Sequence, residues 1–282
     1  MAWAVAGLII KPISTKFRPL SINSITLSVA WIILATIMAL WGKLSSLTFV
    51  GWPSTAYVIG SAVVGVGIAG ILEIKSMSFA DISLVYPINF SFYVFSASTM
   101  AAIFFGEPLS RYTILGAILI ASGITLLSSP SKVKVRGALN SDRTKGIILA
   151  LISGLCWGGA TILSKLALYV IDPSVLNVLR LPFVILPFII ITLVRDGVSE
   201  YRRYTPKDLI QTGVGGFLNH TVGTVLFFVA INLIGAIKAT ILSSISPLFI
   251  APLSVIFLKE KLTKRVILGI IVCAIGILFT TL

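Results

Sequence analysis

Four polar side chains recur along one apolar segment at intervals that place them on a single helical face. Tyr86, Asn89, Tyr93 and Ser96 follow one another by three, four and three residues, and side chains at these intervals lie above one another in an α-helix. Two phenol rings and an amide can bind the polar and the apolar parts of one small molecule. We predict that Tyr86, Asn89 and Tyr93 bind substrate. A hydrogen-bonded packing stripe between helices is the alternative.

Polar residues also interrupt the apolar segments of the second half of the chain. Trp157 and Thr161 lie four residues apart, and Ser164 follows three residues later. Ser243 and Ser246 precede a proline, which frees a backbone carbonyl that could serve a ligand or a hinge. We take the two serines near the proline, together with Trp157 and Thr161, as further candidates for substrate binding. Ordinary packing is again the alternative.

Asn219 and His220 lie near the middle of another apolar segment. His220 is the only histidine, and its ordinary pKa of about 6.5 suits a group that takes up and releases a proton. We predict that both residues bind substrate and that His220 is a candidate for proton coupling, with a structural histidine as the alternative. The acidic residues, Glu73 among them, fall at predicted helix ends or in loops. We therefore expect no carboxylate proton relay.

Three basic residues of the second half, Lys165, Arg180 and Lys238, lie within or at the ends of apolar segments. Lysine and arginine bind carboxylate or phosphate groups, so Lys165 is a further candidate for substrate binding, and Arg180 and Lys238 for anion binding. Extension of the side chains to a lipid–water interface, or pairing with Asp172, is the alternative. Nothing resembles a metal cluster, a phosphate-binding loop or a paired nucleophile and base. We expect no metal, no cofactor and no enzymatic activity.

The composition identifies the surroundings of these residues. The chain has 282 residues, of which 57% are hydrophobic and only 11% are charged, and its mean hydropathy is +1.07. Soluble domains carry roughly 25% charged residues, so a soluble enzyme is excluded, and a disordered chain needs low hydrophobicity. The formal net charge is +13. In so apolar a chain we read this charge against a lipid bilayer rather than a nucleic acid.

A helix needs about 20 apolar residues to cross a bilayer, and the apolar runs predict an all-α integral membrane protein. Charges, glycines and prolines divide the chain into ten candidate transmembrane helices. Five of them, in the first half, cover residues 1–15, 20–41, 54–72, 78–105 and 112–128. The five helices of the second half cover residues 145–170, 173–194, 208–234, 236–258 and 264–282.

The two halves repeat each other. Residues 104–124 align without a gap on residues 257–277, with ten identities in 21 positions. Tyr93 falls on Ser246 at the same offset of 153, and Trp3 falls on Trp157 at an offset of 154. We therefore divide the chain into a five-helix repeat at 1–128, a basic linker at 129–144 and a second five-helix repeat at 145–282. Because five is odd, the second repeat must be inverted in the membrane, which predicts a binding site near the midplane and alternating access.

Helix one is short compared with its counterpart. A stretch of 11 apolar and small residues precedes Trp157, whereas only two residues precede Trp3. We expect from this difference that the beginning of helix one is truncated.

The motifs resemble those of the EamA-type members of the drug/metabolite transporter superfamily. They are the two five-helix repeats, a Trp-Gly element (Trp157-Gly158), a Glu-x-Leu-Ser/Thr turn that begins at Glu107 and again at Glu260, and a Gly-x6-Gly pattern in the last helix of each repeat. Ala4 stands where a glycine would follow Trp3. The resemblance implies a ten-helix carrier, often an exporter of amino acids or related metabolites, and its wider relatives include nucleotide-sugar and sugar-phosphate exchangers.

The basic residues indicate an orientation. Sixteen Lys and Arg residues fall in the loops after helices one, three, five, seven and nine, and three fall on the opposite side. Because cytoplasmic loops carry the Lys/Arg excess, the count places both termini outside. The family resemblance implies both termini inside.

These observations predict a multi-pass carrier of the cell membrane that moves a small polar metabolite, an amino acid or its analogue, by alternating access, with export as the expected direction. Its partners are the substrate and the lipid bilayer, not nucleic acid, and the sequence does not indicate an oligomeric state. Convergence of the three cations on the cavity would favour an exchanger of phosphorylated or nucleotide-linked sugars. A closed interface without a polar cavity would favour a non-transporting scaffold or a lipid-handling subunit.

Overall fold

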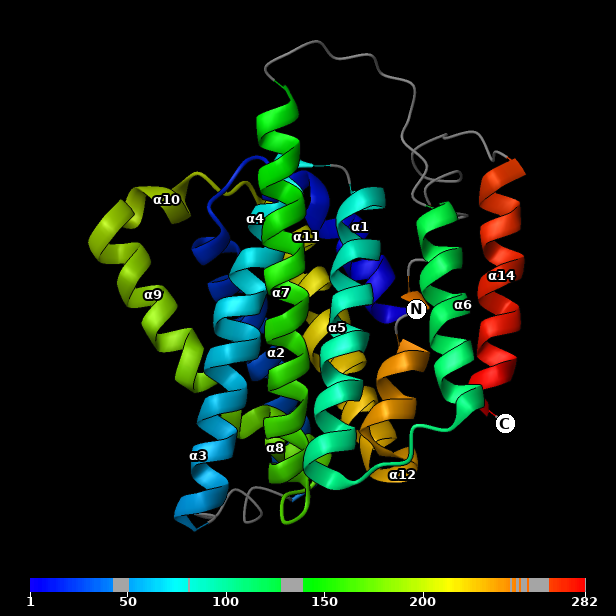
Figure 1. Ribbon diagram of the computed structural model, residues 1–282. Coiled ribbons are helices and arrows are strands. Elements are labelled where there is room, and N and C mark those ends of the chain that lie inside the picture. Colours follow the sequence, from blue (N-terminus) through cyan, green and yellow to red (C-terminus); the bar gives the residue numbers. More distant parts are fainter. Residues whose placement is uncertain are drawn as a thin grey trace.

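The structure is a computed structural model that describes residues 1–42, 51–80, 82–127, 139–243, 245–246, 249, 253 and 264–281. Every regular element within these ranges is a helix, and none is a strand (Figure 1). The predictions for Pro247, Glu260 and most of the basic linker concern residues outside these ranges.

Long helices account for the first half of the chain. Residues 52–79 form one continuous rod whose middle, η2, is a π-helix. The elements are α1 (Ala2–Ser14), α2 (Pro19–Leu40), α3 (Trp52–Ser61), η2 (Ala62–Ala69), α4 (Gly70–Phe79), α5 (Ile82–Phe105) and α6 (Arg111–Leu127).

The second half has the same kinds of element. Its rod at residues 206–234 also contains a π-helix, η3. Gly235, with φ of 80°, interrupts the helix after this rod. The elements are α7 (Leu139–Leu168), α8 (Pro173–Arg180), α9 (Pro182–Asp196), α10 (Val198–Arg202), α11 (Pro206–Gly216), η3 (Phe217–Gly223), α12 (Thr224–Ser243) and α14 (Lys264–Thr281).

Several helices begin at residues that favour a helix start. Pro19 and Pro173 occupy first-turn positions, where the missing amide hydrogen would have no partner in any case. The Asp172 side chain accepts a hydrogen bond from the backbone of α8. Thr205 and Asp208 form a reciprocal capping box at α11. Local side-chain chemistry thus explains where these helices begin.

The helices have the length and surface of membrane-spanning segments. Among the residues that the structure describes, six helical segments are long and apolar enough to cross a bilayer, and α1, α6 and α14 contain shorter apolar stretches. Large apolar side chains point outward along them, for example Phe95, Leu186 and Leu278, which are each at least 60% exposed. In water such a surface would be costly, whereas in lipid it is favourable. The chain is therefore a multi-pass membrane protein.

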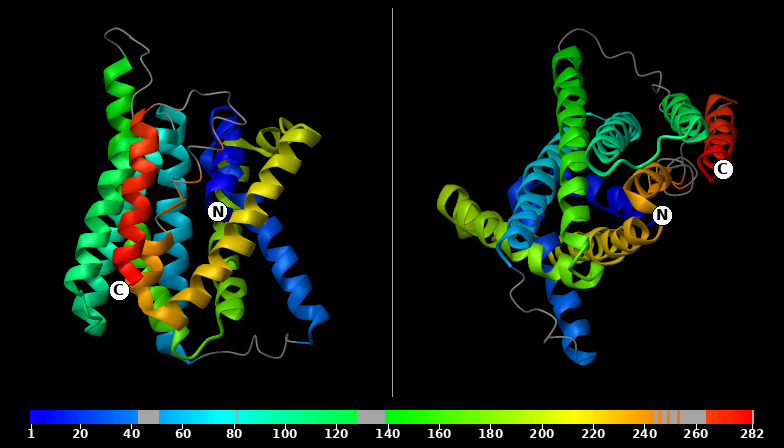
Figure 2. Two further views of the ribbon diagram at one scale, coloured as in Figure 1. Left: turned by 90° about the vertical axis from the view of Figure 1, so that its right-hand side faces the viewer. Right: turned by 60° about the horizontal axis from the view of Figure 1, so that its bottom comes forward.

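Corresponding helices of the two halves run in opposite directions. In Figure 1, α6 begins at the lower end of the bundle and α14 begins at the upper end, and the two pack side by side. The rod at 52–79 likewise runs upward, whereas the rod at 206–234 runs downward. Figure 1 shows α9 and α10 on one side of the bundle and α6 and α14 on the other, and the right view of Figure 2 agrees.

Two predicted boundaries are wrong. The third helix continues to Phe79 instead of ending at residue 72, because the Glu73 carboxylate has a hydrogen-bond partner and does not need to leave the membrane. Helix α7 begins at Leu139 rather than at residue 145, and therefore includes the end of the predicted linker. Residues 173–196 form one apolar span, in agreement with the predicted segment, and Pro182 divides it into α8 and α9.

Gly158 of the Trp-Gly element sits where α5 and α7 touch. A Cβ atom at Gly158 would lie 1.8 Å from the Ser96 hydroxyl oxygen and 2.8 Å from the Ala97 backbone nitrogen. At the adjacent Gly159, a Cβ atom would meet nothing within 4 Å. Close approach of the two helices therefore requires glycine at the first position only.

We expect Gly158→Ala to destabilise the protein by about 1–3 kcal/mol, the usual cost of overpacking a tight contact. Gly159→Ala is the matched control and should leave stability unchanged or raise it slightly, because alanine favours helix. Thermal unfolding of the purified variants measures the difference. Equal stability of the two variants would contradict the packing role of Gly158.

Candidate substrate cavity

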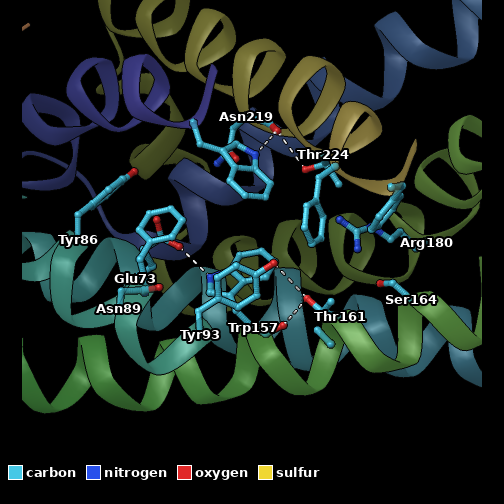
Figure 3. A pocket seen from close by; sticks show the side chains of 15 residues that line it. Glu73, Tyr86, Asn89, Tyr93, Trp157, Thr161, Ser164, Arg180, Asn219 and Thr224 are labelled. Carbon is cyan, nitrogen blue, oxygen red and sulfur yellow. Dashed lines mark hydrogen bonds between the residues drawn. The ribbon is translucent and has the colours of Figure 1, made fainter. Parts of the chain in front are cut away.

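A cavity of about 60 Å³ lies within the helix bundle, and residues from both halves of the chain line it (Figure 3). Small-molecule sites occupy roughly 300–1,000 Å³, so the cavity is contracted and must widen to admit a metabolite. Its lining combines aromatic rings with polar and charged groups: Trp3, Glu73, Tyr86, Asn89, Phe90, Tyr93, Trp157, Ala160, Thr161, Ser164, Arg180, Asn219, Thr224, Phe227 and Phe228.

Three of the four residues on the predicted polar face of α5 line the cavity. Tyr86, Asn89 and Tyr93 are among the lining residues, and all three are buried. Asn89 also donates to the Ser153 hydroxyl on α7 at 2.9 Å. Ser96, one turn further, packs against α7 and bonds to the Gly154 carbonyl instead. The face therefore combines the two roles that the spacing allowed, lining and helix packing.

The two repeat-related tryptophans make reciprocal contacts between the halves. Trp3, on the first helix of the first half, donates its indole N–H to the Asn219 carbonyl on η3 at 3.1 Å. Trp157, on the first helix of the second half, donates to the Glu73 carboxylate on α4 at 2.8 Å. Thr224 donates to the same Asn219 carbonyl at 3.0 Å. Each tryptophan thus links its own half to the third helical rod of the other half.

Arg180 supplies a positive charge to the cavity. It is 2% exposed, its Nε donates to Asn177 at 3.0 Å, and its guanidinium lies 4.7 Å from the Phe228 ring centroid. Within the described part of the chain it forms no ion pair. A buried guanidinium without a carboxylate partner is costly and is characteristic of a site that receives an anionic group.

Sequence reasoning missed Glu73, which we expected at the end of a helix. In the structure it lines the cavity, with Trp157 and the Tyr86 hydroxyl as hydrogen-bonding neighbours. Figure 3 shows Glu73 and Arg180 toward opposite ends of the cavity. The placement of Glu73 at a helix end is therefore wrong, because the residue lies within the continuous rod at 52–79.

Aromatic rings form the rest of the wall, and most of them were also missed. Trp3 lies 5.3 Å from Phe227 and 6.4 Å from Phe90, between ring centroids, and Tyr93 lies 6.3 Å from Phe227. Such spacing is typical of favourable edge and offset contacts. The pairing of Trp3 with Trp157 in the repeat could have identified Trp3. Phe90 and Phe227 carried no signal that distinguished them from other apolar residues.

The three predicted cations do not converge. Lys165 pairs with Glu107 in the connection between α5 and α6, and its ammonium lies 4.2 Å from the Phe105 ring centroid. Lys238 is exposed on α12. Of the three, Arg180 alone lines the cavity. Glu107 also accepts hydrogen bonds from the backbone amides at the start of the helix after Gly235, so it stabilises that helix start.

The remaining candidates differ in whether they line the cavity. Thr161 lines it and bonds to the Tyr93 hydroxyl at 3.4 Å. Ser243 and Ser246 each donate to the backbone carbonyl three residues earlier, and neither is among the described lining residues. His220 lines a second, smaller cavity. Asn219 lines both cavities, so the predicted Asn219-His220 pair divides between them.

Membrane-spanning helices that enclose a polar cavity between two halves of a chain define the architecture of a carrier. Comparison with known families agrees: the EamA-like transporter family matches residues 1–129 and 144–282. The chain belongs to this family and is a transporter.

Curated relatives agree with the family assignment, and a solved structure shares the fold. Uncharacterised transporters of Clostridium kluyveri, Archaeoglobus fulgidus and Bacillus subtilis (strain 168, YoaV) are 25%, 25% and 24% identical over 60%, 79% and 80% of this chain. The matching regions span 54%, 74% and 75% of those proteins. One crystal structure has the same fold, with a TM-score of 0.74 at 15% identity, over 99% of this chain and 92% of that chain.

Proposed function

We propose that this transporter carries a small metabolite with a carboxylate group, an amino acid or an analogue, across the cell membrane by alternating access, with export as the expected direction. The observation that carries the proposal is Arg180, a buried guanidinium without an ion-pair partner among the described residues, inside a cavity with aromatic and polar walls. A planar guanidinium fits a carboxylate with two parallel hydrogen bonds.

The rest of the lining suits the other parts of an amino acid. Asn89, Tyr93 and Thr161 offer an amide and hydroxyl groups near the aromatic wall, which could bind an amine. Trp157 and Phe227 present ring surfaces to an apolar side chain or to a cation. The site thus offers one strong anion partner and several adaptable contacts.

Alternating access between two inverted five-helix repeats rests on three supporting features. Corresponding helices run in opposite directions in Figure 1. Both halves contain a π-helix in the third rod, at 62–69 and at 217–223. Trp3 and Trp157 each donate a hydrogen bond to a residue of the other half. A site at the interface of two such repeats becomes accessible from each side when one repeat rocks against the other.

Polar contacts join the two halves at both ends of the bundle. The end of α1 and the beginning of α11 lie at the upper end in Figure 1. Next to these helix ends, Arg18 pairs with Asp196 at 2.9 Å and Lys16 with Asp208 at 3.1 Å. At the lower end, Glu107 pairs with Lys165. The two basic side chains at the upper end are more than half exposed, whereas Glu107 and Lys165 are 15% and 13% exposed. Because water weakens exposed ion pairs, we infer that the Glu107–Lys165 pair holds the two halves together more strongly than the two pairs at the upper end.

The alternatives have less support. An exchanger of phosphorylated or nucleotide-linked sugars would need the three cations to meet at the cavity, yet Lys165 pairs with Glu107 and Lys238 is exposed. A non-transporting scaffold or lipid-handling subunit would be favoured by an interface without a polar cavity, whereas Arg180 and Glu73 line one. The side of the membrane on which the basic loops lie remains a prediction of the charge count.

Reconstituted vesicles test the substrate class. We expect protein-dependent counterflow of labelled amino acids, because exchange at equal concentrations requires only binding and alternation. Labelled sugar phosphates in parallel vesicles should show none, since a phosphate-bearing sugar would find one cation in the cavity instead of three. Transport of sugar phosphates alone would favour the exchanger, and transport of neither class in either direction would contradict the proposal.

A further inference from the structure

A second cavity of about 30 Å³ adjoins the first. The two share four lining residues, Glu73, Tyr86, Trp157 and Asn219, which stand between them. Helices α1, α2, α4, α11 and η3 provide most of the remaining wall of the second cavity, including Asn23, Thr26 and His220. A water molecule needs roughly 10–15 Å³ of such volume, so the second cavity has room for about two waters and not for a metabolite.

Two buried polar atoms in its wall lack a hydrogen-bond partner among the described residues. They are Asn23 Nδ2 and His220 Nδ1, on side chains that are 3% and 4% exposed. An unsatisfied buried polar atom is destabilising, and such atoms in native proteins are almost always satisfied by protein or ordered water. Water in this cavity would satisfy both atoms and would reach Glu73.

Glu73 faces both cavities. Trp157 donates to its Oε2 at 2.8 Å, and the Tyr86 hydroxyl is its second hydrogen-bonding neighbour. Within the described residues no cation lies within 4 Å of this carboxylate. A carboxylate with neutral donors only, enclosed by a membrane, is poised to bind a proton.

The neighbouring elements bring few other charges to Glu73. Arg180 of α8 and Tyr93 of α5 line the first cavity, and His220 of η3 lines the second. Lys11 of α1 donates to backbone carbonyls at the far end of α4, and Lys145 of α7 lies near the ring of Phe79 there. The remaining ionisable residues of α7 are Asp142, Arg143, Cys156 and Lys165, and none of them lines either cavity. On α2, residues 19–40 include no ionisable side chain.

We propose that Glu73 binds and releases the coupling proton of this carrier, and that water in the second cavity, held by Asn23 and His220, conducts the proton to it. The proton adds to a carboxylate oxygen of Glu73 from water on one side of the membrane and returns to water on the other side after the repeats have rocked. No other bond forms or breaks. The proposal rests on the carrier function proposed above and adds its energy source.

Infrared difference spectroscopy tests the proton site without any substrate. Acidification of the reconstituted protein should produce the C=O band of a protonated buried carboxyl, and Glu73→Gln should lack this band because the amide cannot take up the proton. Asp142→Asn is the matched control, since this residue is exposed and its loss also removes one carboxylate; it should retain the band. Absence of a band that depends on Glu73 would overturn the proposal, whatever the transport assays show.

A second variant, His220→Phe, tests whether water in the second cavity conducts the proton. His220→Phe replaces a polar wall group with an apolar one, so it should slow the deuterium shift of the Glu73 carboxyl band in heavy water by roughly tenfold or more, because it removes one of the groups that hold the water. An unchanged rate would exclude the proposed water route.

Transport assays with the amino acid that shows the strongest counterflow test the coupling. A pH difference of one unit can drive roughly tenfold accumulation if one proton is exchanged per substrate. In Glu73→Gln vesicles we expect no accumulation of the amino acid in response to the pH difference, whereas Asp142→Asn vesicles should accumulate it as the wild type does. Retained accumulation would overturn the proposal. Loss of counterflow in a folded Glu73→Gln variant would assign Glu73 to substrate binding and would also overturn it. If the wild type moved no amino acid, the proposed function would fail, and the infrared result would still decide the proton site.

Discussion

Replacement of Arg180 by glutamine is expected to raise the half-saturation concentration for amino acid counterflow by roughly 30-fold or more. Charge-assisted hydrogen bonds contribute about 1.5–3 kcal/mol each, and 1.4 kcal/mol is a factor of ten in affinity. Because no described carboxylate pairs with Arg180, its removal leaves no opposite charge unpaired. Thermal stability should therefore stay the same or rise, which separates a binding role from a structural one.

Two further variants make this test specific. Arg180→Lys keeps the charge but loses the planar fork, so we expect it to recover only part of the affinity. Lys238→Gln removes an exposed cation from the same half of the chain and should transport normally. Near-normal counterflow by Arg180→Gln would exclude a carboxylate site at the guanidinium and with it the main support for an amino acid substrate.

Replacement of Glu107 by alanine is expected to lower the free energy of unfolding by about 3 kcal/mol, the usual cost of breaking a largely buried ion pair. The carboxylate pairs with Lys165 and accepts hydrogen bonds from the amides of Ala236 and Ile237 at 2.9 and 2.8 Å. Gly235, where φ is 80°, turns the chain toward it, and a Cβ atom there would lie 3.1 Å from a carboxylate oxygen. Without Glu107, a buried ammonium and two amides lose their partner.

A double variant separates the contribution of the ion pair from the contribution of the hydrogen bonds at the helix start. Glu107→Gln with Lys165→Met removes both charges but leaves a side-chain carbonyl for the amides, so it should be clearly more stable than Glu107→Ala. Unfolding midpoints of the purified proteins measure the order. If Glu107→Ala were as stable as the wild type, the contact would not hold the two halves together.

The same contact predicts a dependence of stability on pH. Burial alone would raise the pKa of the Glu107 carboxyl, but the Lys165 ammonium and the amides of Ile237 and Ala236 lower that pKa below its ordinary value. A lowered pKa stabilises the folded state above the pKa of the unfolded chain, and this stabilisation disappears as the pH falls through the folded pKa. The unfolding midpoint of the wild type should therefore fall in acid more steeply than that of Glu107→Gln. Parallel curves would show that the charge of Glu107 adds nothing.

Local patterns were sufficient for the helices and for one helical face. Mean hydropathy and the spacing of prolines and glycines predicted a helical membrane protein, and most helix boundaries agree within a few residues. The interval between Tyr86, Asn89 and Tyr93 depends only on the helical repeat, and these residues do share the cavity. The Trp-Gly and Glu-x-Leu elements indicated the family, which the comparison confirms.

The sequence did not predict which residues on distant helices pair with each other. Glu73 was assigned to a helix end because a charge ordinarily leaves the membrane, yet Trp157, 84 positions away in the chain, gives it a buried donor. Lys165 was expected near the substrate, but Glu107 pairs with it 58 positions away. In both cases the energy that decides the position of the charge comes from a contact between helices and has no trace in the neighbouring residues.

The sequence by itself determined the class of protein and most of its helical segments, because hydrophobic length and helical periodicity are properties of adjacent residues. The tertiary structure alone decided which polar groups meet: Arg180 unpaired in one cavity, Glu73 between two cavities, and Lys165 bound to Glu107. In a membrane the cost of a charge depends on its nearest partner rather than on its position in the chain. Only the packing of the helices supplies that partner.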